Sequence, residues 1–169
     1  MSAKNSIDLD SDPRSIIGSR VFDAPRKLVF AAFTDPKHLA QWWGPTGFTT
    51  TTHSFEFRAG GTWRFVMHGP DGRDYQNRVT YEEIVAPERI VYRHGGGDDV
   101  EPVKFSQTLT FEDLGNGQTR LNWHGTFPTA EARARVIKDY GADKGLAQTM
   151  ARLADYVSQL ASSGAIVSS

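Results

Sequence analysis

Hydrophobic and polar residues alternate through the middle of the chain. Between about residues 49 and 126, short runs rich in aromatic and β-branched residues are separated by turn-forming clusters such as Pro70-Asp71-Gly72 and Asn116-Gly117. A period of two is typical of strands with one buried face, and such clusters are typical of the turns between strands. With an earlier strand over residues 15–22, the pattern predicts seven strands in an antiparallel meander.

Helical patterns flank this region. Pro25 opens one short helix, and a second begins at Pro36 with Asp35 as the expected N-cap. Thr129 is expected to cap another short helix near the C-terminus. In the longer helix that follows, spacings of four and three residues align an apolar stripe of Leu146, Met150, Leu153, Val157 and Leu160.

A sheet with one apolar face and a long amphipathic helix bury their apolar surfaces by packing face to face. The 169 residues suit one domain. We therefore expect an α+β fold in which a curved antiparallel sheet wraps the last helix, as a single domain over residues 15–161. Residues 1–14 are expected to form a flexible leader and residues 162–169 a flexible tail, because both are small and polar.

Composition narrows the functional classes. The 19 basic and 20 acidic residues leave a net charge of -1, which disfavours nucleic acid as a partner. The chain has no cysteine, no signal-peptide pattern and no apolar stretch long enough to span a bilayer, so we expect a cytoplasmic protein without stable membrane insertion. An exposed edge strand leaves a homodimer open as an alternative to a monomer.

Motifs for metal and nucleotide chemistry are missing. The five histidines show no metal-ligand spacing, and there is no phosphate-binding loop, dinucleotide fingerprint or nucleophile elbow. We therefore expect no metal and no cofactor. His94, or His68 at a strand end, is a candidate general acid or base, and the alternative for each is an ordinary hydrogen-bonded histidine.

The predicted inner face is rich in aromatic and flexible side chains, which favours a pocket for an apolar ligand. Polar residues on the same face would orient such a ligand, although Asn77 and Gln107 have the alternative of bonding one another or a buried water. For each aromatic residue, the alternative is ordinary core packing. The candidate lining residues are Trp43, Phe55, Trp63, Phe65, Met67, Asn77, Tyr81, Tyr92, His94, Phe105, Gln107, Trp123, Leu146 and Met150.

An ordered set of short motifs resembles a known family. The motifs are Trp42-Trp43-Gly44-Pro45, the run from Phe57 to Trp63, the run from Phe65 to Gly72, and Pro87-Glu88-Arg89-Ile90-Val91-Tyr92. Across about residues 15–160 the chain resembles bacterial relatives of the Hsp90-ATPase-activator domain, in the START/Bet v 1-like (SRPBCC) superfamily. The resemblance implies a helix-grip fold with a cavity between the sheet and the last helix. It departs at Leu146, where many relatives have Trp, and this would alter the volume of the cavity.

Three functional classes follow. The first is binding of a small hydrophobic or amphipathic molecule, such as a lipid or polycyclic metabolite, and it needs no catalytic group. The second is a pocket enzyme of the cyclase, dehydratase or isomerase type, with His or Tyr as acid–base groups. The third, ranked last, is a cofactor of an Hsp90-type chaperone, because the chain offers no obvious docking patch.

Overall fold

The computed structural model describes residues 5–95 and 103–163. The strands are β1 (Ser6–Asp8), β2 (Ser15–Phe22), β3 (Thr49–Phe55), β4 (Thr62–His68), β5 (Asp74–Val85), β6 (Arg89–His94), β7 (Phe105–Gly115) and β8 (Gln118–Thr126). The helices are α1 (Arg26–Ala31), α2 (Pro36–Trp42), α3 (Ala130–Tyr140) and α4 (Ala142–Ser162). The predicted α+β fold is confirmed.

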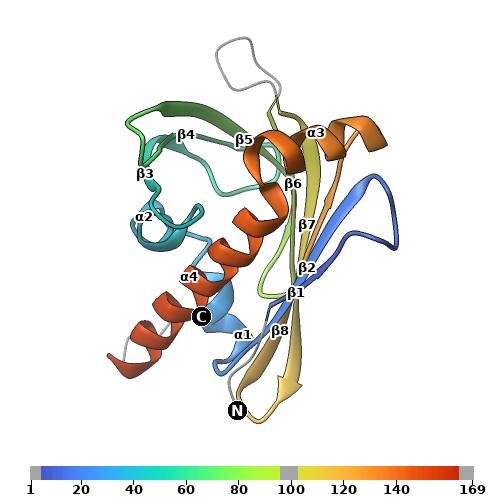
Figure 1. Ribbon diagram of the computed structural model, residues 1–169. Helices are drawn as coiled ribbons and strands as arrows, with labels where there is room; N and C mark the ends of the chain where they lie inside the picture. The colour runs from blue at the N-terminus through green and yellow to red at the C-terminus, as the bar shows by residue number, and fades with distance from the viewer. Residues whose placement is uncertain (1–4, 96–102, 164–169) are drawn as a thin grey trace.

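The strands form one antiparallel sheet in the order β1-β2-β8-β7-β6-β5-β4-β3. Figure 1 shows the sheet curving so that β3, β4 and β5 turn over towards the helices. Alternate residues are buried in the central strands, as in β8, where Thr119, Leu121 and Trp123 face the interior. This alternation places the core on the concave face.

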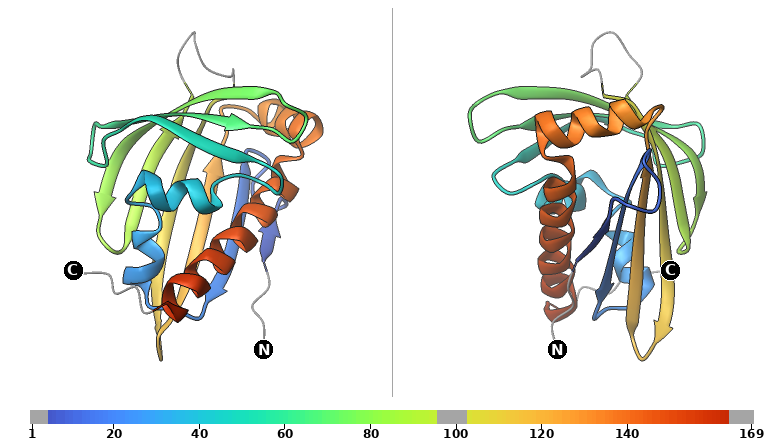
Figure 2. Two further views of the ribbon diagram at one scale, coloured as in Figure 1. Left: turned by 90° about the vertical axis from the view of Figure 1, so that its left-hand side faces the viewer. Right: turned by 45° about the vertical axis from the view of Figure 1, so that its right-hand side comes forward.

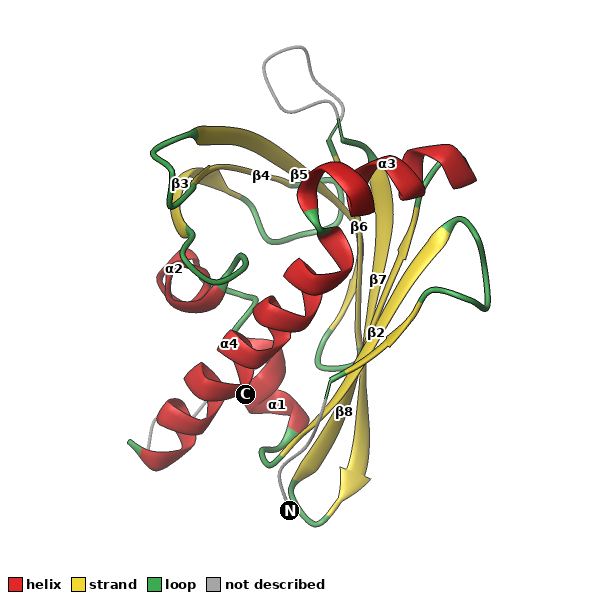
Figure 3. Cartoon of the chain, in the orientation of Figure 1, coloured by secondary structure: helices red, strands yellow, loops and turns green. Residues whose placement is uncertain are grey.

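Helix α4 crosses the concave face and is its main cover, and the left-hand view of Figure 2 shows it in front of the sheet. Its buried residues are Thr149, Met150, Leu153 and Val157, which include most of the predicted stripe. The short helices α1 and α2 lie on the same side of the sheet, beside α4 (Figure 3). The space between the sheet and α4 is therefore enclosed by helices.

The predicted helix caps are confirmed. The Asp35 side chain accepts a hydrogen bond from the backbone N–H of Lys37 at 2.8 Å, and Thr129 Oγ1 accepts one from Ala132 at 3.0 Å. Such caps satisfy N–H groups that the first helical turn leaves unpaired. Local sequence chemistry therefore defines where α2 and α3 begin.

The structure adds an eighth strand to the predicted seven. Strand β1 lies within the segment expected to be a flexible leader, and it pairs with β2 through Ser6–Asp8. Asn5 next to it donates from Nδ2 to the carbonyl of Ala147 on α4 at 2.7 Å. A three-residue strand has too little alternation to be detected by pattern, and these long-range contacts hold it in place. Residues 1–4 of the leader and 164–169 of the tail lie outside the described residues.

None of the described helices is long and apolar enough to cross a membrane.

Candidate functional site

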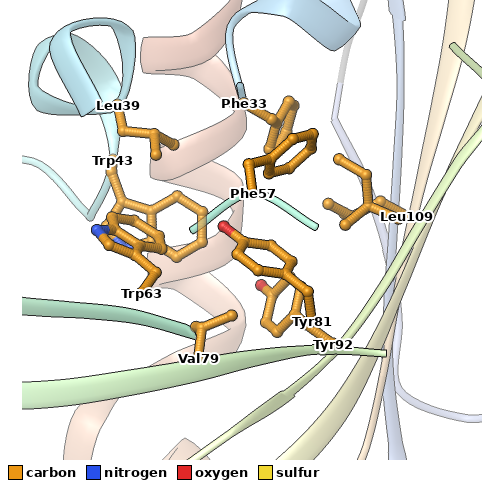
Figure 4. Close-up of a pocket in the computed structure, with 10 residues that line it drawn as sticks. Phe33, Leu39, Trp43, Phe57, Trp63, Val79, Tyr81, Tyr92 and Leu109 are labelled. Carbon is orange, nitrogen blue, oxygen red and sulfur yellow. The ribbon is translucent and has the colours of Figure 1, made fainter. Parts of the chain in front are cut away.

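A small cavity lies in the core between the sheet and the helices. Its lining is apolar and aromatic except for two tyrosine hydroxyls (Figure 4). The volume of the cavity is about 10 Å³, which is room for the centre of about one water molecule. The lining residues are Phe33, Leu39, Trp43, Phe57, Trp63, Val79, Tyr81, Ile90, Tyr92 and Leu109. In this conformation, side chains fill most of the space predicted for a ligand.

The cavity wall is built from aromatic rings in contact. Trp43 meets Trp63 edge-on with ring centroids 4.8 Å apart, and Trp63 stacks on Phe65 at 3.9 Å. Phe57 meets Tyr81 edge-on at 5.1 Å. Such pairs are individually favourable, by about 0.5–1.5 kcal/mol beyond the area they bury. The rings therefore hold one another in place as well as lining the cavity.

Tyr81 and Tyr92 supply the polar part of the lining. Each is only 4% exposed. Figure 4 shows both oxygens directed into the cavity. Burial raises the pKa of both phenols well above the ordinary tyrosine value, and for Tyr92 the neighbouring Tyr81 adds to this shift. Both side chains therefore remain neutral and able to donate a hydrogen bond.

Gln107 extends these tyrosines into a row across three strands. The strand register places Tyr81 opposite Tyr92, and Tyr92 opposite Gln107. Gln107 is 3% exposed, and its amide has no hydrogen-bond partner among the described residues. We call Tyr81, Tyr92 and Gln107 the polar row.

A second pair of polar side chains, Asn77 and His94, lies next to the polar row. Asn77 donates from Nδ2 to the carbonyl of Tyr75 at 2.9 Å, which leaves its Oδ1 facing His94 Nε2 at 3.0 Å. Because Oδ1 can only accept, this hydrogen bond requires a proton on Nε2 of His94. Nδ1 is buried and lacks a hydrogen bond of ordinary geometry with the described residues. Burial lowers the pKa of His94 to about 4, and the backbone of Val103 opposes that shift in part.

An open groove begins on the other side of His94. The His94 ring stacks on Phe105 at 4.7 Å, and Phe105 packs against Phe127 at 5.2 Å. The groove has a volume of about 250 Å³, compared with about 10 Å³ for the cavity. The residues that line it include Arg93 and Lys104. The His94–Phe105 stack therefore borders both the buried Asn77 and the solvent-open groove.

Trp43 lies between the cavity and the surface. It follows α2 directly and is half-buried, whereas Trp42 is fully buried and donates from Nε1 to the carbonyl of Ala32 at 3.0 Å. Adjacent residues at the end of a helix point in different directions, and the two rings accordingly differ in burial. Arg152 of α4 fixes the turn after Trp43, because its Nη1 donates to the carbonyls of Gly44, Pro45 and Phe48 at 2.9, 3.0 and 3.1 Å.

The structure divides the fourteen predicted site residues into groups. Trp43, Trp63, Tyr81 and Tyr92 line the cavity, and His94 and Phe105 line the groove. Five others are buried without lining the cavity, namely Phe65, Asn77, Gln107, Trp123 and Met150. Three are half-buried at the edge of the core, namely Phe55, Met67 and Leu146. Their role as ligand contacts stays a prediction.

Leu146 lies elsewhere than the resemblance implied. A side-chain carbon added to Gly18 of β2 would come within 2.8 Å of Leu146 Cδ2, so Leu146 packs on that bare strand and not on the cavity. Leu146 therefore contributes to the contact between α4 and β2. Its effect on the volume of the cavity stays a prediction.

Six cavity residues were not among the predicted site residues. Val79, Ile90, Leu109 and Phe57 belong to the apolar alternation, and Phe33 and Leu39 to the apolar faces of the short helices. Pattern alone marks all six as buried. Only the curvature of the sheet and the position of α2 decide which buried residues border a void.

Within the described ranges, no group of three or more His, Asp or Glu side chains is placed to hold a metal ion.

Comparison with known proteins places the chain in a family. Its solved relatives include a protein from Arthrobacter aurescens with 28% identity and a TM-score of 0.83, and 91% of each chain is covered. A protein from Staphylococcus epidermidis has 28% identity and a TM-score of 0.75 over 89% of this chain and 93% of that one. The AHSA1 protein from Silicibacter pomeroyi has 21% identity and a TM-score of 0.70, covering 86% and 98%, and this likeness shows the fold. No curated protein matches the chain.

Residues 23–158 match the family described as Activator of Hsp90 ATPase homolog 1-like protein. The match covers the helices, the sheet from β3 to β8 and most of α4, and it agrees with the motifs and the helix-grip architecture. The chain therefore belongs to the Activator of Hsp90 ATPase homolog 1-like family of the SRPBCC fold.

Proposed function

We propose that this protein binds a small hydrophobic or amphipathic molecule between the sheet and α4. The observation that carries the proposal is the aromatic cavity into which two buried tyrosine hydroxyls point. A buried hydroxyl is stabilised by a hydrogen bond and costs about 1–3 kcal/mol when it has none. A ligand with an oxygen atom at this place would pair with these hydroxyls.

The cavity must enlarge for this function. Small-molecule pockets usually have volumes of roughly 300–1,000 Å³, far more than the room for about one water seen here. Trp43 is the side chain best placed to move, since it lines the cavity and is half-buried on a turn. Met67 lies against the same turn, as a side-chain carbon on Gly44 would come within 2.9 Å of its Cε. A flexible thioether next to Trp43 makes such repacking easier.

Two other functional classes have less support. A pocket enzyme would use His94, but its lowered pKa of about 4 leaves it neutral near pH 7 and therefore unable to donate a proton as an imidazolium. A chaperone cofactor needs a docking surface. Within the described residues, the exposed large hydrophobic side chains are Val85 at 36% and Tyr140 at 48%, and they lie on different elements. Single exposed side chains of this kind are ordinary on monomeric proteins.

The direct test combines native mass spectrometry of the purified protein with thermal-shift screening against fatty acids, sterols, flavonoids and polyketide-like aromatics. A ligand at a hundredfold excess over its Kd stabilises the folded state by roughly 2.7 kcal/mol. We expect at least one class to raise Tm. We also expect Trp43→Ala to change the affinity or the rate of binding, because that side chain separates the cavity from solvent.

Tyr140→Ala is the matched control, since it truncates an exposed aromatic residue on α3, away from the cavity. It should leave binding unchanged. If no class of compound binds to the wild-type protein or to Trp43→Ala, the interior is only a core, and the ligand-binding function is wrong.

A further inference from the structure

The polar row selects the chemical class of the ligand. Its three side chains, Tyr81, Tyr92 and Gln107, come from adjacent strands and lie side by side on the buried face. All are at least 96% buried, with exposures of 4%, 4% and 3%. Of their polar atoms, Gln107 Nε2 is buried without a hydrogen-bond partner within the described part of the chain. Apolar residues of the same shape at these positions would avoid the cost of burying polar groups.

Gly125 makes room for one end of the row. It lies opposite Gln107 on β8, and a side-chain carbon at Gly125 would come within 2.6 Å of Gln107 Oε1. No residue with a side chain fits there while the amide keeps its place. The glycine therefore leaves the space that the buried Gln107 amide occupies next to β8.

The surroundings of the row carry no charge. Among the described residues, no Asp, Glu, Lys or Arg is buried, and the buried polar residues are all neutral Ser, Thr, Asn or Gln. Arg20 is the nearest cation on this face of β2. It lies opposite Leu121 of β8, which is four residues, or about 13 Å, along the strand from Gly125. Its Nη1 donates to Asn5 Oδ1 at 2.7 Å, and its buried Nε has no partner among the described residues.

We propose that the polar row binds the neutral oxygen of an uncharged amphipathic ligand, such as a hydroxyl or carbonyl group, and rejects carboxylates. This inference rests on the proposed ligand-binding function and specifies its ligand class. Tyrosine hydroxyls and a carboxamide both donate and accept, so they satisfy a neutral oxygen completely. A carboxylate would lose its hydration without gaining a cation, and the cost of burying such a charge is several times that of a hydrogen bond.

The binding test uses three probes of one skeleton: 2-naphthol, 2-naphthoate and 2-methylnaphthalene. We expect 2-naphthol to bind roughly tenfold more tightly than either of the others at pH 7, measured by calorimetry or probe fluorescence. In Tyr92→Phe and Gln107→Leu, the preference for 2-naphthol over 2-methylnaphthalene should fall towards one. If 2-methylnaphthalene binds as well as 2-naphthol, or if the variants keep the preference, the row does not recognise the ligand. In that case the ligand-binding function itself stands.

A stability measurement tests the row without any ligand. Because Gln107 has no protein partner, Gln107→Leu should leave Tm unchanged or raise it. The control is Thr119→Val, since Thr119 is fully buried and donates from Oγ1 to the carbonyl of Ala24 at 2.7 Å, so its loss should lower Tm. A drop in Tm for Gln107→Leu as large as that for Thr119→Val would show that the amide serves the fold, and it would overturn the inference. If no class of compound binds in the screen that tests the proposed function, that function fails first, whatever this comparison shows.

Discussion

At the scale of single residues, His94 is held by contacts on several sides. Its Nε2 donates to Asn77 Oδ1, its ring stacks on Phe105, and its Nδ1 is buried without a partner in the described residues. Each of these contacts suits the neutral ring, because burial disfavours the imidazolium. The ordinary histidine pKa of 6.5 is lowered to about 4 in the folded state. Between these two values the unfolded chain binds a proton and the folded protein does not.

This difference predicts how stability depends on pH. The contribution of His94 is fully present above about pH 6.5 and is lost as the pH falls towards 4, because the unfolded state takes up the proton. The wild-type protein should lose up to about 3 kcal/mol more than His94→Gln between pH 7 and pH 4. Glutamine retains a donor for Asn77 and does not titrate in this range.

Urea unfolding at a series of pH values measures the effect as the difference between the two proteins. The carboxylates common to both cancel in that difference. Parallel stability profiles for the wild type and His94→Gln would mean that His94 is solvated in the folded state.

At the scale of elements, α4 determines the position of the turn that carries Trp43. Arg152 Nη1 donates to three carbonyls of this turn, and the rest of its side chain is half-buried beside them. The apolar stripe of α4 packs on the sheet at the same time. One helix therefore covers the core and holds the boundary of the cavity.

Removing the Arg152 donors should loosen this turn. Arg152→Met keeps a long apolar stem but leaves the carbonyls of Gly44, Pro45 and Phe48 without their donor. We expect a loss of about 1–3 kcal/mol in the free energy of unfolding. Hydrogen exchange should also become faster for amides of residues 43–48 than for those of β7 and β8.

Arg135→Met is the matched control, because Arg135 is exposed on α3. The same chemical change there should alter stability by less than about 0.5 kcal/mol. Unchanged exchange at residues 43–48 in Arg152→Met would show that packing alone holds the turn.

At the scale of the whole molecule, the core is tightly packed except for a small void. Most of the aromatic cavity wall is fully buried, and the remaining void is central, next to Leu109 and Val79. Protein interiors are normally packed as tightly as organic crystals. A void at this place is therefore a site where the core can accept added volume.

Leu109→Ala should enlarge this void and make it detectable. Leu109 is fully buried and lines the cavity, so its truncation should cost about 2–5 kcal/mol. Benzene or indole should then bind in the enlarged cavity and recover part of the loss in Tm. Thermal unfolding with and without each compound is the measurement.

Leu121→Ala provides the comparison, since Leu121 is equally buried but does not line the cavity. It should lose similar stability and recover less of it with the same compounds. Equal recovery in both variants would mean that the new space in Leu109→Ala does not join the existing cavity.

Much of the architecture follows from local chemistry. The seven strands, the caps at Asp35 and Thr129, and the stripe on α4 are all present as the pattern predicts, because each depends on residues close together in sequence. The burial of Asn77, Tyr81, Tyr92 and Gln107 also follows from alternation, since strand residues two apart face the same side. The family assignment agrees with the motifs.

The tertiary structure alone decided how these inward residues meet. Alternation assigns a side chain to a face, but only the register between strands places Tyr81, Tyr92 and Gln107 in one row opposite Gly125. Strand β1 and the small size of the cavity were likewise beyond the pattern. They depend on contacts between distant segments, such as Asn5 with Ala147, and on how aromatic rings from helices and sheet fill the same space. The sequence by itself determined which residues are buried, and the curvature and register of the sheet determined which of them share a site.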